Sequence, residues 1–147
     1  MENVVRLLWV KIVGTAVLAS VPLLFTPPWL MEALGFPRFE STIFLRLLGL
    51  STTALLVGYY GGIEQARRGE WPSAVLRMGL VSNAGQGGLI VLAAASGALS
   101  GWGWPAQALL LSTGVFVLAI AAAIVALQRR RALSGATSAS PWRRAAT

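Results

Sequence analysis

Four long stretches of the chain are almost purely apolar, and short segments between them hold most of the polar residues. The apolar stretches run from about 4 to 25, 42 to 63, 74 to 98 and 106 to 127. One helical crossing of a bilayer needs about 20 apolar residues, and none of the stretches alternates in polarity as a barrel strand would. Because a span in lipid must satisfy its backbone hydrogen bonds internally, the pattern predicts an all-α integral membrane bundle of four transmembrane helices.

Prolines and short connections support these boundaries. Pro27 and Pro28 follow the first stretch, whereas Pro72 and Pro105 precede the third and fourth. Proline ends a helix but costs no hydrogen bond in a first turn. The short connections predict that consecutive helices are antiparallel neighbours. Pro22 lies inside the first stretch, where we expect a kink of the kind that membrane helices tolerate.

Basic residues predict the orientation of the bundle. Arg38 and Arg46 fall on one side of a four-span topology, and the other ten of the twelve basic residues fall on the opposite side. These ten are Arg6, Lys11, Arg67, Arg68, Arg77, Arg129, Arg130, Arg131, Arg143 and Arg144. Since cytoplasmic loops are enriched in Lys and Arg, both termini are predicted to be cytoplasmic, in a bacterial inner membrane. Residues 1–128 form the predicted membrane domain, and residues 129–147 a basic tail too polar to fold alone.

The composition of the 147 residues agrees with a membrane protein and narrows the chemistry. Hydrophobic residues make up 56% and charged residues 12%, against about 25% charged in a soluble domain. Cys, His and Asp do not occur, so we expect no metal site, no cofactor and no catalytic residue. The five acids are all Glu and lie outside the four stretches. A proton-coupled antiporter usually needs a carboxylate within the membrane. Most of the net charge of +7 determines topology, so we expect no nucleic-acid partner.

Asn83 and Gln86 are the polar pair most deeply placed in an apolar stretch. They stand three residues apart and so lie on neighbouring helix faces. One interpretation is a polar lining for a buried ligand or solute. The other is a clamp in which side-chain amides bond a facing helix for about 0.6 kcal/mol each. We favour the clamp.

Arg46 enters about one turn into the second stretch. It could hold an anion at the mouth of a pocket, or it could reach the interface and pair with Glu32 or Glu40. We favour the ion pair. The same three residues are the most plausible set for an enzyme acting on a hydrophobic substrate, although two solvated loop glutamates are far commoner than an acid–base couple.

Glycines at four-residue spacing predict close helix packing. Gly58 and Gly62 form one such pair, and Gly79 and Gly87 lie in a second row that contains Asn83. Small residues let helix backbones approach in lipid. The same rows could instead mediate self-association of the chain.

The junction between the first connection and the second stretch reads LGFPRFESTIFLRLLGLSTTALLVGYYGG. Its Leu-Gly-x-Pro loop, the Arg-x-x-Gly of Arg46 and Gly49, and its final Gly-Tyr resemble small bacterial four-helix membrane proteins of the DoxX-like kind. Some proteins of that group are linked to quinol- or thiosulfate-oxidising complexes as accessory subunits. The resemblance implies a four-helix membrane fold and carries no activity over to this chain.

These patterns predict a non-catalytic integral membrane protein. It would be an accessory subunit of a membrane complex or a small binding bundle for a lipophilic molecule. The expected partners are membrane lipids, other membrane subunits or a second copy. One alternative is a permease or channel for a small neutral solute lined by Asn83 and Gln86. Another is the membrane enzyme described above.

Overall fold

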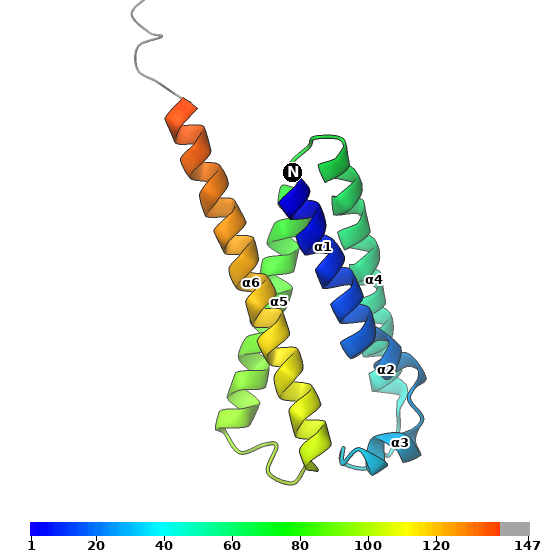
Figure 1. Cartoon of the computed structure of the whole chain (residues 1–147). Helices are drawn as coiled ribbons and strands as arrows, with labels where there is room; N and C mark the ends of the chain where they lie inside the picture. Colours follow the sequence, from blue (N-terminus) through cyan, green and yellow to red (C-terminus); the bar gives the residue numbers. More distant parts are fainter. Residues whose placement is uncertain (139–147) are drawn as a thin grey trace, which may run out of the picture.

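The computed structural model describes the backbone of residues 1–138 and the side chains of residues 1–134. The elements are α1 (Glu2–Thr15), the π-helical turn η1 (Ala16–Ser20), α2 (Val21–Phe25), α3 (Pro28–Ala33), α4 (Ile43–Arg67), α5 (Ser73–Ala95) and α6 (Trp104–Ser138). Residues 1–138 contain no strand (Figure 1). Four helical segments are long and apolar enough to cross a membrane: Glu2–Phe25, Ile43–Arg67, Ser73–Ala95 and Trp104–Ser134. The prediction of an all-helical chain with four such segments is confirmed.

The first of these segments is continuous but irregular at its centre. The wider turn η1 interrupts the α-helix directly before Pro22. A proline ring clashes with the carbonyl four residues earlier, here that of Leu18. A π turn changes the hydrogen-bond spacing at this point and gives the ring room. The irregularity that Pro22 causes therefore lies in the turn before it.

The helix ends differ from the expected ones at three places. The first connection contains the short helix α3, which begins at Pro28. Helix α5 ends at Ala95, just before Gly97, whose φ of 74° is the left-handed conformation that commonly ends helices. Helix α6 continues past residue 127 to Ser138, since Arg and Ala are good helix formers. The last part of the predicted tail, residues 139–147, lies outside the described residues.

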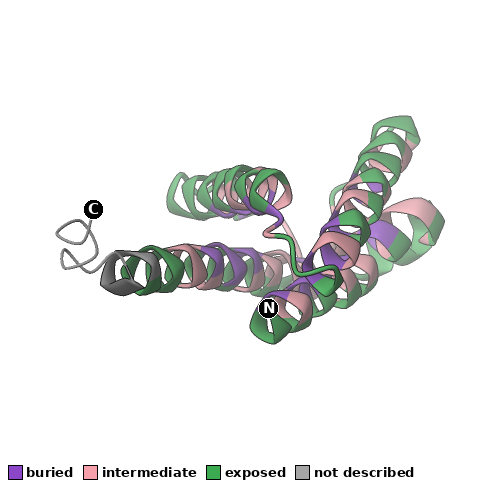
Figure 2. Ribbon diagram, turned by 90° about the horizontal axis from the view of Figure 1, so that it is seen from above, coloured by how far each residue is buried: buried purple, intermediate pink, exposed green. Residues whose placement is uncertain are grey.

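The long helices are arranged as two pairs. Helix α1 packs along α4, α5 packs along α6, and contacts of α1 with α6 and of α4 with α5 join the pairs (Figures 1 and 2). The N-terminus, the α4–α5 loop and the last turns of α6 lie at one end of the bundle, at the top of Figure 1. We call this the basic end and define it as residues 1–8, 64–77 and 128–134.

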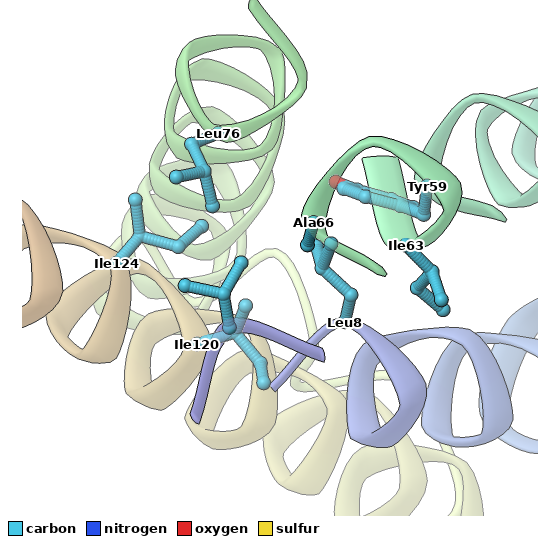
Figure 3. Close-up of a cluster of buried hydrophobic side chains, with 8 residues drawn as sticks. Leu8, Tyr59, Ile63, Ala66, Leu76, Ile120 and Ile124 are labelled. Atoms are coloured by element: carbon cyan, nitrogen blue, oxygen red, sulfur yellow. The ribbon is translucent and has the colours of Figure 1, made fainter. Parts of the chain in front are cut away.

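The buried apolar core lies toward the basic end and draws on all four long helices. Its members are Val4, Leu8, Tyr59, Ile63, Ala66, Leu76, Ile120 and Ile124. Figure 3 draws these side chains, seven of them labelled, converging from the two helix pairs. In lipid, such a core stabilises the bundle mainly through close van der Waals packing.

The opposite end is held together by backbone contacts between the residues that follow α3 and those around the start of α6. Gly103 N–H donates to the carbonyl of Gly35 at 2.7 Å, and Ala106 N–H donates to that of Leu34 at 3.0 Å. A Cβ built on Gly35, whose φ is 86°, would lie 2.4 Å from Gly103 Cα. Only glycine fits both the conformation and the contact. The α3 region is thereby fixed to the start of α6.

Candidate functional site

The most unusual feature of the interior is a polar cluster formed by Lys11, Tyr59 and Asn83. Lys11 is 3% exposed and Asn83 is fully buried. Lys11 Nζ donates a hydrogen bond to Asn83 Oδ1. Asn83 Nδ2 donates to the Gly79 carbonyl and, at 3.4 Å, to the Tyr59 hydroxyl. The cluster therefore joins three helices, α1, α4 and α5, through the amide of one asparagine.

The sequence of α1 explains why a lysine is buried here. Val4, Leu8, Lys11 and Thr15 are the buried residues of this helix, and steps of three and four residues place them on one helix face. The lysine thus occupies a position in the packing stripe. Its aliphatic stem follows the core, as long basic side chains commonly do.

The amino group of Lys11 is surrounded by rings and one amide. It lies 5.9 Å from the centroid of the Tyr59 ring and 5.6 Å from that of Phe116, within the range of cation–π attraction. Among the described residues no carboxylate forms an ion pair with it. One turn along the same face, the buried hydroxyl of Thr15 has no hydrogen-bond partner. The Lys11 amino group is therefore held by side chains of neighbouring helices, whereas the Thr15 hydroxyl is buried without a hydrogen bond.

Gln86 is not part of this cluster. Its side chain is half-buried and forms no side-chain hydrogen bond with the described residues. The sequence pairs Gln86 with Asn83, but the structure does not bring the two amides into one site. A second polar contact links α4 to the first segment instead, where Ser20 Oγ donates to Thr52 Oγ1 at 3.0 Å between two buried side chains.

Arg46 binds backbone carbonyls at the end of α2. Its two terminal nitrogens donate to the carbonyls of Leu23 and Thr26, both at 2.7 Å. A helical residue at position 27 would donate to the Leu23 carbonyl, but Pro27 has no N–H. Arg46 supplies the missing donor from the facing helix.

The glutamates that we paired with Arg46 lie elsewhere. Glu32 is 3.8 Å from Arg38, and within the described residues Arg46 forms no ion pair with Glu32 or Glu40. The favoured ion pair of Arg46 is therefore replaced by a helix-capping role. The set Glu32, Glu40 and Arg46 is not assembled as an acid–base site.

The four glycines chosen from their spacing lie against neighbouring helices. A Cβ on Gly62 would be 2.8 Å from Val75 Cγ1, and one on Gly87 would be 2.5 Å from Leu118. Gly79 faces Tyr59 and Ile124, whereas Gly58 faces the end of Met78 at 3.3 Å. Gly79 and Gly87 thus bring α5 close to α4 and α6.

Lys11 is a site residue that the sequence assigns only to topology, because a basic residue near the end of a span is a common orientation signal. Its spacing from Val4, Leu8 and Thr15 was the available clue. Residues 1–138 contain no group of three or more His, Cys, Asp or Glu that could hold a metal ion. No family model, curated protein or solved structure matches the chain.

Proposed function

We propose that this chain is a non-catalytic, multi-pass membrane protein that acts by binding, as an accessory subunit of a membrane complex or as a carrier bundle for a lipophilic molecule. The buried polar groups support this proposal because the asparagine amide is fully engaged by neighbouring helices. Glu32, Glu40 and Glu70 lie outside the four membrane-length helices, and Glu2 and Glu64 lie within the last turn at an end of one. Such an interior offers a rigid scaffold rather than reactive groups.

The observation that carries the accessory role is an unoccupied row of small residues on α5. Ala84, Gly85 and Gly88 are exposed, and nothing lies within 4 Å of a Cβ built on Gly85 or Gly88. Gly79 and Gly87 on the same helix are in contact with neighbours. Small residues at four-residue spacing permit close approach of another membrane helix. We propose that a helix of a partner subunit, or of a second copy, packs there.

The proposed topology has four antiparallel spans with both termini in the cytoplasm of a bacterial cell, the bundle lying in the inner membrane. The arginines of the basic end support this orientation under the positive-inside rule. The motifs around Arg46 and Gly49 add the resemblance to DoxX-like proteins, some of which are linked to oxidising complexes as accessory subunits.

A permease for a neutral solute finds less support. Such a path would need the Asn83 and Gln86 amides to face a common opening, whereas Asn83 is fully buried and bonded to Lys11, Gly79 and Tyr59. An enzyme at the other end would need Arg46 beside a glutamate, and Arg46 is engaged by carbonyls. We therefore do not propose either activity.

The accessory role is tested by cross-linking in native membranes. The chain has no cysteine, so single cysteines at Gly85 or Gly88 report the α5 face alone. We expect a discrete cross-linked product from these positions and none from Val115→Cys on the exposed face of α6. In the Gly85→Cys protein, Gly88→Leu should abolish the cross-linked product. Gly61→Leu, also at an open position, should leave that product intact. A chain that forms no product at either α5 position would contradict the accessory role.

A further inference from the structure

The ion pairs of the basic end leave some of its arginines uncompensated. Each of its three glutamates pairs with an arginine: Glu2 with Arg6, Glu64 with Arg67 at 3.1 Å, and Glu70 with Arg68 at 3.7 Å. Within the described residues, no glutamate pairs with Arg77, Arg129, Arg130 or Arg131. This end therefore carries a surplus of positive charge that the fold does not neutralise.

Two of these arginines line a groove between α5 and α6. The groove has a volume of about 680 Å³, and within the basic end it is lined by Trp71, Ser73, Arg77, Gln128 and Arg131. The Arg131 guanidinium lies over the Trp71 ring, 4.4 Å from its centroid, which holds this side chain at the groove. No acidic residue lines it. The first turn of α5, which begins at Ser73, adds the positive end of a helix dipole.

The groove changes character toward the middle of the bundle. Its remaining wall includes Leu80 and Val81, one turn of α5 beyond Arg77, and Val81 is 74% exposed. Cationic and hydroxyl groups thus stand at the end where headgroups of a bilayer would lie, and an apolar wall continues into the span. A free anion would use only the first half of this surface.

We propose that this groove binds an anionic phospholipid, with the phosphate between Arg77 and Arg131 and the start of one acyl chain against Leu80 and Val81. Guanidinium groups bind phosphate oxygens through paired, charge-assisted hydrogen bonds. The Ser73 hydroxyl and the Gln128 amide are additional donors for the same oxygens. Basic pockets between membrane helices commonly hold anionic headgroups. The site is separate from the open face around Gly85 and Gly88, so it does not depend on the accessory role proposed above.

Lipid retention by the full chain tests this proposal. The protein, purified in a mild uncharged detergent, is titrated with phosphatidylglycerol or with phosphatidylcholine of identical acyl chains, and bound lipid is counted by native mass spectrometry. We expect saturable binding of one phosphatidylglycerol and at least tenfold weaker binding of phosphatidylcholine. Each groove arginine should raise the affinity for phosphatidylglycerol about fivefold, so R77Q/R131Q should weaken binding of this lipid roughly 25-fold.

A matched control separates the groove from general surface charge. R129Q/R130Q removes two arginines that form no ion pair with a glutamate of the described residues and that do not line the groove, and it should change binding less than threefold. Val81→Trp keeps both arginines but fills the apolar half, and should also weaken lipid binding by tenfold or more. Both variants alter exposed positions, and retained helical circular dichroism shows that they fold.

The outcomes decide the assignment. Equal loss of binding in R77Q/R131Q and R129Q/R130Q would overturn the site, as would equal affinity for the two lipids. Inorganic phosphate at millimolar concentration should not displace phosphatidylglycerol. Complete displacement by inorganic phosphate, with Val81→Trp binding normally, would mean an anion site and would overturn the assignment to a lipid.

Discussion

Lys11 on α1 and Asn83 on α5, separated by 72 positions in the chain, share a buried hydrogen bond that the core residues enclose. The bond places the only buried amino group of the described chain against the only fully buried amide. The Lys11 amino group therefore depends on Asn83 Oδ1 for its hydrogen bond, whereas Asn83 Nδ2 has its own acceptors in Gly79 and Tyr59. The pair links the two helix pairs of the bundle.

Replacement of Asn83 should destabilise the bundle through the group it leaves behind. Asn83→Leu leaves the buried Lys11 amino group without a hydrogen-bond acceptor, which should lower the free energy of unfolding by about 1–3 kcal/mol. In a Lys11→Met background the same substitution should cost less, because no buried donor is stranded. Reversible unfolding in mixed micelles measures all four proteins of the cycle. Additive effects of the two substitutions would mean that the pair is not coupled.

Two adjacent glycines of α5 should respond oppositely to the same substitution. Gly87→Val pushes a side chain into Leu118, 2.5 Å from the built Cβ, and overpacking of this kind typically costs about 1–3 kcal/mol. Gly88→Val meets open space and should leave the unfolding midpoint unchanged. Thermal unfolding in detergent compares the two variants directly. Equal destabilisation of both would contradict the packing described for α5 and α6.

Removal of Arg46 should loosen the end of the first span. Arg46→Gln removes the two hydrogen bonds to the carbonyls of Leu23 and Thr26. A hydrogen bond from a charged donor typically adds about 1.5–3 kcal/mol to the free energy of unfolding. We expect lower stability and faster amide exchange in residues 21–26. Glu40→Gln should change neither property, since Glu40 forms no ion pair with Arg46. A larger effect of Glu40→Gln than of Arg46→Gln would restore the ion-pair interpretation.

Hydropathy alone was sufficient to predict the four long helices, because each stretch is longer than a bilayer crossing and free of alternation. The partner of Arg46 was not predictable in the same way. It depends on the absent N–H of Pro27 and on the position of the Leu23 carbonyl opposite α4, which is a contact between elements. A glutamate nearby in sequence was the simpler candidate, and it lies elsewhere.

The roles of the small residues on α5 also depend on neighbours. Gly87 and Gly88 are adjacent and chemically identical, yet one contacts Leu118 and the other faces open space. Small residues occur on several faces of this helix, so spacing cannot separate internal packing from an open face. Lys11 differs in this respect, since its spacing from Val4, Leu8 and Thr15 places it on their helix face in the sequence itself. Its nearness to the end of a span equally favours an interfacial lysine.

Labelling of single cysteines from outside intact cells tests most directly the claim that the chain crosses a membrane four times with its basic end in the cytoplasm. Ser100→Cys lies in the α5–α6 loop, and Gly69→Cys lies in the α4–α5 loop at the basic end. Both positions are exposed. A membrane-impermeant maleimide should label Ser100→Cys in intact cells and Gly69→Cys only after permeabilisation. Labelling of Gly69→Cys in intact cells, or recovery of either variant in the soluble fraction without detergent, would contradict the account.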